Sequence, residues 1–128
     1  MTEPLGPVPV GITNDVVVEV TGAMTPGHVA ALVISTPSLV SIIEGACRRC
    51  VLPHLPEGHD TVGTHVCVSH EGVALVGQEV RVRCELIEVK GRHLSFAVTV
   101  DGPRGTVSQG THGRAVVDPS RFARADKT

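Results

Sequence analysis

The sequence predicts an α+β fold in which an antiparallel sheet wraps around one long helix. Two patterns lead to this prediction. One apolar stretch repeats with the period of a helix, and almost everything after it alternates between apolar and polar residues with the period of a strand. Of the 128 residues, 41% are hydrophobic, which is enough for one packed core. We therefore expect one domain over residues 1–128, with an extended lead-in at 1–13 and a polar tail at 119–128.

The long helix is predicted to have Pro37 at its first helical position. Ser35, Thr36 and Pro37 offer a hydroxyl cap followed by a proline, which is favoured in the first turn because an N–H there would have no partner. We expect Thr36 to be the capping residue. Apolar residues then recur at helical spacing, at Leu39, Ile43, Ala46 and Cys50. Because few polar residues interrupt them, this helix should be largely buried.

Five strands are expected, one before the helix and four after it. They cover residues 16–20, 62–70, 79–89, 94–100 and 106–117. Turn sequences at 90–92 and 101–105 join the last three strands as antiparallel hairpins. A helix with so little polar surface must be covered by the sheet, and a sheet wrapped around one helix is the hot-dog fold.

Composition and spacing exclude several classes of function. The formal charge is −2, the basic residues are scattered, and Phe96 and Phe122 are the only Phe, Tyr or Trp residues, so nucleic-acid binding is not expected. Apolar stretches are too short to cross a bilayer and the N-terminus does not resemble a signal peptide, so we expect no membrane partner and a cytoplasmic location. The cysteines at 47, 50, 67 and 84 do not have the spacing of a zinc site, so we expect free thiols and no metal.

Glu44 is the residue that most suggests a functional site. It lies in the middle of the apolar helix. An unpaired buried carboxylate is unfavourable, so Glu44 should have a partner, be protonated or line a cleft. The alternative is that Glu44 lies on a narrow polar stripe and faces water, and the pattern alone does not choose between these hypotheses.

His70 and Thr36 are weaker candidates on the pattern alone. His70 ends the strand 62–70, in which residues 64, 66, 68 and 70 share one face and 63, 65, 67 and 69 the other. From there His70 could reach a cleft, although a lone histidine more often has a structural role. The Thr36 hydroxyl and the N–H groups of the helix N-terminus could polarise a carbonyl, or Thr36 could serve only as the cap.

Four segments resemble the fluoroacetyl-CoA thioesterase family. TPSLVSIIEGAC at 36–47 is similar to the active-site helix of that family, and VGTHVCVSH at 62–70 is similar to its second signature. EVKGRHLSF at 88–96 and GTHGRAVV at 110–117 are similar to the hairpin and the closing strand. The spacing of eight residues from Thr36 to Glu44, and of twenty-six from Glu44 to His70, is that of the family's catalytic residues.

This resemblance implies a hot-dog homodimer that hydrolyses an acyl-CoA thioester, with active sites at the subunit interface. It implies Thr36, Glu44 and His70 as the catalytic residues, with coenzyme A as part of the substrate and no bound cofactor. The same resemblance implies that the substrate-binding residues are Gly63, Thr64, His112 and Arg114.

One departure from the family bears on the substrate. Ala30 stands where the family has an aromatic lid residue, so we expect a small acyl group other than fluoroacetyl. Two alternatives remain open. One is a non-catalytic protein that binds acyl-CoA or a small ligand on the same fold. The other is a hydratase acting on an enoyl thioester, although the short helical motif that pairs an acidic residue with histidine is missing.

Overall fold

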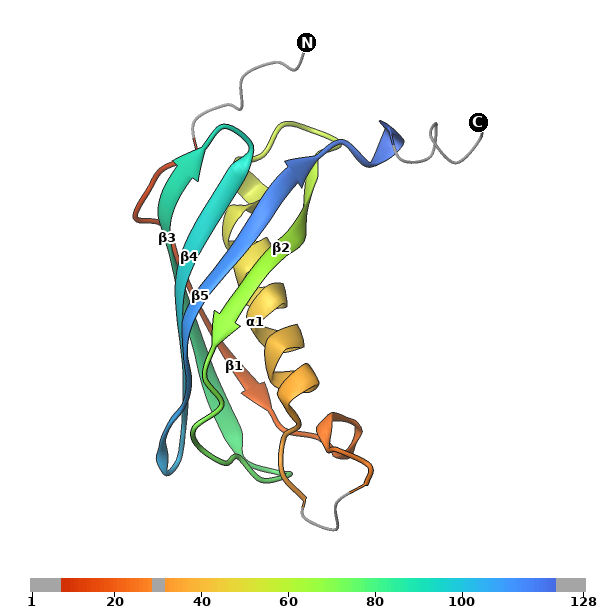
Figure 1. Cartoon of the computed structure of the whole chain (residues 1–128), viewed down its shortest axis with the longest axis vertical. Helices are drawn as coiled ribbons and strands as arrows, with labels where there is room; N and C mark the ends of the chain where they lie inside the picture. The colour runs from red at the N-terminus through yellow and green to blue at the C-terminus, as the bar shows by residue number, and fades with distance from the viewer. Residues whose placement is uncertain (1–7, 29–31, 122–128) are drawn as a thin grey trace.

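A five-stranded antiparallel sheet covers one long helix in the computed structural model, which describes residues 8–28 and 32–121 (Figure 1). The elements are β1 (Thr13–Glu19), η1 (Gly22–Met24), α1 (Thr36–Val51), η2 (Leu52–His54), β2 (Asp60–Val68), β3 (Glu79–Lys90), β4 (His93–Gly102) and β5 (Gly105–Val117). The strand order is β1-β3-β4-β5-β2, so β1 and β2 form the two edges. This arrangement confirms the predicted hot-dog fold. No helix among the described residues is long and apolar enough to cross a membrane.

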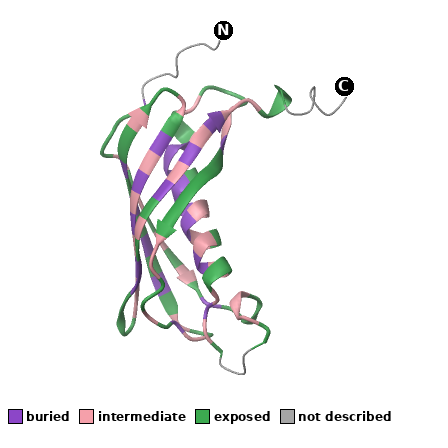
Figure 2. Cartoon of the chain, in the orientation of Figure 1, coloured by how far each residue is buried: buried purple, intermediate pink, exposed green. Residues whose placement is uncertain are grey.

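The core lies between α1 and the inner faces of β3 and β4. Alternate residues of these two strands are buried, as predicted, and the bands of buried and exposed residues are visible in Figure 2. The buried residues of α1 are Leu39, Ile43, Ala46, Cys47, Cys50 and Val51. Phe96 is the largest of the fully buried side chains, so an aliphatic core is packed around one aromatic ring. β1 begins at Thr13 rather than at the predicted Val16.

The inner face of the sheet becomes polar along β5 and β2. The buried polar residues of the described chain are Thr61, Ser108, His112 and Arg114. Three of these lie on β5, where β3 and β4 carry apolar residues at the equivalent positions. Buried polar groups require hydrogen-bond partners, so a functional site is expected on this side of the core.

A bulge in β2 corrects the predicted faces of that strand. Simple alternation places Gly63 and Val66 on opposite faces. The pairing register shifts between Gly63 and His65, so that Gly63 lies opposite Arg114 and Val66 lies opposite His112. Gly63 therefore faces the helix together with Val66, because the bulge inserts one extra residue between them.

Ser35 is the residue that caps α1, so the prediction that Thr36 is the cap is wrong. The Ser38 N–H donates to Ser35 Oγ at 3.2 Å, and Thr36 is the first residue of the helix. Both of these adjacent hydroxyl residues are favoured caps by type, and the backbone geometry shows which of them caps the helix. As a result the Thr36 hydroxyl is available for another partner.

Replacing Ser35 with alanine should lower the free energy of unfolding by about 1 kcal/mol, because the helix N-terminus loses its side-chain acceptor. Thr36→Ala should have a smaller effect on stability, since its side chain is exposed and accepts no N–H of the first turn. Urea denaturation of the two variants beside the wild type measures both effects. A larger loss of stability for Thr36→Ala would contradict the assignment of the cap.

Candidate active site

Thr36 and His70 meet at the N-terminal end of α1. Thr36 Oγ1 lies 2.8 Å from His70 Nδ1, and both residues are exposed. His70 follows the end of β2, but the chain there still runs along β5, since the N–H groups of Ser69 and Glu71 donate to Gln109 and Val107 at 2.9 Å. This backbone pairing holds the imidazole toward the helix, so a hydroxyl and a ring nitrogen lie within hydrogen-bond reach of one another.

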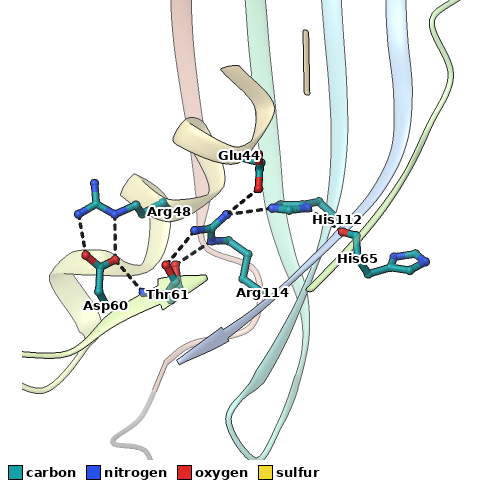
Figure 3. A network of polar contacts seen from close by, with 7 residues as sticks. All are labelled: Glu44, Arg48, Asp60, Thr61, His65, His112 and Arg114. Carbon is teal, nitrogen blue, oxygen red and sulfur yellow. Dashed lines mark hydrogen bonds and ion pairs between the residues drawn. The ribbon is translucent and has the colours of Figure 1, made fainter. Parts of the chain in front are cut away.

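Glu44 lies in a separate polar group with Arg114 and His112 (Figure 3). Gly63 lies beside its carboxylate. Glu44 Oε2 is 3.7 Å from Arg114 Nη1, and the side chain of Glu44 is 41% exposed while that of Arg114 is 6% exposed. A Cβ atom on Gly63 would lie only 2.5 Å from this oxygen, so glycine makes the room that the carboxylate occupies. Glu44 is thus neither fully buried nor simply facing water.

The Glu44 carboxylate is held by charge and not by a hydrogen bond. Among the described residues, no donor lies within hydrogen-bond distance of its oxygens, and the ion pair with Arg114 is its one polar contact. The lone pairs of the carboxylate are therefore free to accept a proton or a hydrogen bond from a water or a substrate.

Arg114 is fixed by partners on two strands. Its Nε donates to Thr61 Oγ1 at 2.7 Å, its Nη2 donates to the Thr61 carbonyl at 2.9 Å, and its Nη1 donates to His112 Nε2 at 3.1 Å. His112 in turn donates from Nδ1 to the His65 carbonyl at 2.8 Å. Because the carbonyl can only accept, the proton is on Nδ1, and Nε2 of the neutral ring is the acceptor for Arg114.

Burial lowers the pKa of His112, and the nearby Arg114 cation acts in the same direction. The folded chain therefore resists protonation of His112 at a pH where an ordinary histidine, with a pKa of 6.5, already binds a proton. Since the unfolded chain binds more protons than the folded one below this value, the free energy of unfolding should fall as the pH drops through this range.

We expect His112→Asn to flatten this acid-side loss of stability, because asparagine does not titrate and can still donate to the His65 carbonyl. The measurement is urea denaturation of wild type and variant at several pH values between about 7.5 and 5.5. An equal loss of stability on acidification in both proteins would contradict the neutral state assigned to His112.

Within one chain the structure does not bring Glu44 to His70. Eight residues separate Thr36 from Glu44 on α1, which places them about 12 Å apart along the helix axis. Glu44 faces Gly63 near the start of β2, whereas Thr36 faces His70 beyond its other end. The predicted catalytic residues thus fall into two groups, Thr36 with His70 and Glu44 with the glycine and the cations around it.

The other predicted substrate-binding residues divide between these groups and the outer face. Gly63, His112 and Arg114 surround Glu44. Thr64 is the extra residue of the bulge and lines a surface groove of about 540 Å³ with His93 and Ser95. His112 lines the same groove. Ala30 falls outside the described residues.

Sequence reasoning missed Thr61 and the ion pair beside it. Arg48 Nε and Nη2 donate to the two carboxylate oxygens of Asp60, at 2.8 and 2.7 Å, and Asp60 Oδ1 accepts the Thr61 N–H at 2.7 Å. Thr61 is 5% exposed, yet in the sequence it looks like a loop residue. Nothing in a single sequence marks an acceptor for a buried arginine that lies 53 residues away.

The four cysteines are free thiols, as predicted, and three of them (Cys47, Cys50 and Cys84) are buried. Burial is the main cause that raises the pKa of Cys50 to about 12, which is typical of an unreactive core thiol. Within residues 8–28 and 32–121 no cluster of His, Cys, Asp and Glu side chains could hold a metal ion.

A sheet wrapped around a helix, with polar groups along the helix and the edge strand, defines a hot-dog protein with a site on α1. The chain belongs to the fluoroacetyl-CoA-specific thioesterase family, whose model matches residues 12–120. The fluoroacetyl-CoA thioesterase of Streptantibioticus cattleyicolor is 37% identical over 90 residues, a match that covers 70% of this chain and 65% of that relative.

Two solved structures agree with this assignment. A phenylalanine-to-alanine mutant of a fluoroacetyl-CoA-specific thioesterase, in complex with fluoroacetate and CoA, is 31% identical with a TM-score of 0.85, covering 90% of this chain and 99% of that one. A thioesterase superfamily member from Thermus thermophilus is 25% identical with a TM-score of 0.86, covering 94% and 92% of the two chains.

Proposed function

We propose that the protein hydrolyses the thioester of an acyl-coenzyme A. The observation that carries the proposal is the 2.8 Å contact between Thr36 Oγ1 and His70 Nδ1 at the N-terminus of α1. A hydroxyl beside an imidazole is the arrangement of an activated nucleophile. The helix N-terminus adds partial positive charge where the carbonyl oxygen of the substrate becomes negative. The similarity to a fluoroacetyl-CoA thioesterase supports coenzyme A as the carrier of the acyl group.

In the first half of the proposed reaction, His70 Nδ1 takes the proton of Thr36 Oγ1 as this oxygen attacks the thioester carbonyl carbon. This requires the His70 tautomer with its proton on Nε2. The carbon–sulfur bond breaks, the proton passes from His70 to the leaving sulfur, and free CoA thiol and an acyl ester of Thr36 are formed.

In the second half, a water attacks the ester carbon and gives one proton to the Glu44 carboxylate, whose lone pairs carry no other hydrogen bond among the described residues. The ester bond breaks, the proton returns to the Thr36 oxygen, and the carboxylic acid is released. Glu44 therefore acts as a general base on water, and not on His70.

Glu44 would reach this ester from a second subunit, because within one chain it lies about 12 Å along α1 from Thr36. We infer a homodimer in which β2 pairs with the same strand of its partner. β2 is an edge strand, and its residues Val62 and Val66 are 44% and 42% exposed. An unpaired edge with exposed valines on both faces favours pairing with another strand. The active site would then contain Thr36 and His70 of one subunit and Glu44 of the partner subunit.

The acyl group is proposed to be small and different from fluoroacetyl, since Ala30 replaces the aromatic residue of the family pattern. A location in the cytoplasm, where acyl-CoA esters are available, stays a prediction.

The experiment is a panel of short, branched, aromatic and fluorinated acyl-CoA esters, incubated with purified protein and a thiol-detecting reagent. Release of thiol from at least one small ester, and weaker turnover of fluoroacetyl-CoA, is the expected result. Binding of the esters without release of thiol would overturn the proposal and support the non-catalytic acyl-CoA-binding protein instead.

A further inference from the structure

Thr61 holds the Arg114 guanidinium with two different atoms. The side-chain oxygen accepts from Nε at 2.7 Å, and the main-chain carbonyl accepts from Nη2 at 2.9 Å. Both residues are 5% exposed, so water does not replace these bonds. A planar group that is bound along one edge by two acceptors of a single residue has a fixed orientation.

This orientation directs the opposite corner of the guanidinium toward Glu44. Nη1 lies 3.1 Å from His112 Nε2 and 3.7 Å from Glu44 Oε2 (Figure 3). No hydrogen bond from the described residues fixes the Glu44 carboxylate, so the charge on Nη1, together with the space over Gly63, determines where it rests. A rotation of the guanidinium would therefore move the carboxylate.

Thr61 is itself anchored between the helix and the strand. Its N–H donates to Asp60 Oδ1 at 2.7 Å, and Asp60 is held by Arg48 near the C-terminal end of α1 through two hydrogen bonds. The Arg48 guanidinium lowers the pKa of Asp60 to about 2, so this pair stays ionised under ordinary conditions. The same helix carries Glu44, so the chain of contacts begins and ends on α1.

We propose that Thr61 is a positioning residue, which fixes Arg114 and so places the Glu44 carboxylate to accept a proton from the attacking water. The inference rests on the proposed thioester hydrolysis. It assigns to Thr61 an effect on turnover and not on the binding of the acyl-CoA, because Thr61 is buried and both of its acceptor oxygens bind Arg114.

The test compares Thr61→Val with Thr61→Ser. Valine has nearly the same shape as threonine but lacks the side-chain oxygen that accepts from Arg114 Nε, whereas serine keeps it. Thr61→Val should lower kcat by about 10- to 100-fold with little change in KM, and Thr61→Ser should recover most of this loss. Thr99→Val is the matched control, since it makes the same change on the outer face of β4 and should keep the wild-type kcat.

A double-mutant cycle separates positioning from a general loss of stability. In Glu44→Asp the shorter carboxylate no longer sits where Arg114 places it, so adding Thr61→Val should lower kcat far less than it does in the wild type. If Thr61→Val lowers kcat equally in both backgrounds, the inference is overturned while the proposed function stands. The same holds if the wild type is active and Thr61→Val alone leaves kcat unchanged. Failure of the wild type to release thiol from any ester would overturn the proposed function, and the role of Thr61 with it.

Discussion

Replacing His70 with alanine should lower the rate of acyl-CoA hydrolysis about a thousandfold while the chain stays folded. The imidazole is exposed, and its one hydrogen bond among the described residues is with the Thr36 hydroxyl. Its removal takes away the acceptor of the Thr36 proton and the donor to the leaving sulfur, and it leaves the core unchanged. The measurement is kcat for thiol release, with urea denaturation to confirm a wild-type fold.

The matched control is His93→Ala, which removes an exposed histidine from the start of β4 and should keep the wild-type kcat. Thr36→Val should lower kcat about as much as His70→Ala does, because the two groups are expected to act as one unit. An active His70→Ala variant would rule out the Thr36–His70 pair as the reacting centre.

The elements that could be predicted from the sequence are those whose signal is local and periodic. The alternation along β3 and β4 predicts the buried faces, and the spacing of apolar residues predicts the length of α1. Both signals come from side chains within one element, because the residues on its buried face must be apolar wherever the other elements lie. The same reasoning identifies Glu44 as a candidate, because its carboxylate interrupts an otherwise apolar helix.

Features that depend on pairing between distant segments could not be predicted in this way. The bulge at Thr64 exists only in the register of β2 against β5, and it reverses the face on which Gly63 lies. The role of Thr61 appears only when Arg114 is placed beside it by the same pairing. The position of the cap at Ser35 depends on the backbone angles of two successive residues that are both good caps.

The division of the site into two groups has a consequence for the order of events in the reaction. In the proposed reaction, Thr36 and His70 form the acyl ester and release CoA thiol without Glu44, since the contact between them is complete in one chain. Glu44 is required only when the ester is hydrolysed. A Glu44→Gln variant should therefore release about one thiol per active site and then stop, with the acyl group attached to Thr36.

Mixing two inactive variants should restore activity if each site is shared between subunits. In a mixed dimer of His70→Ala and Glu44→Gln, one site combines the intact Thr36–His70 pair of the second variant with the intact Glu44 of the first. The other site lacks both groups. When equal amounts are unfolded together and refolded, half of the dimers should be mixed and each should have one complete site, so about a quarter of the wild-type kcat should return.

This recovery, from near background to about a quarter of full activity, follows from the distance between Glu44 and Thr36 on α1. The variants refolded separately are the control, and each should stay inactive. If the mixture is no more active than the two variants alone, while size measurements show that mixed dimers have formed, then Glu44 acts within its own chain or not at all. A monomeric protein with full activity would lead to the same conclusion, because no partner subunit would then supply Glu44.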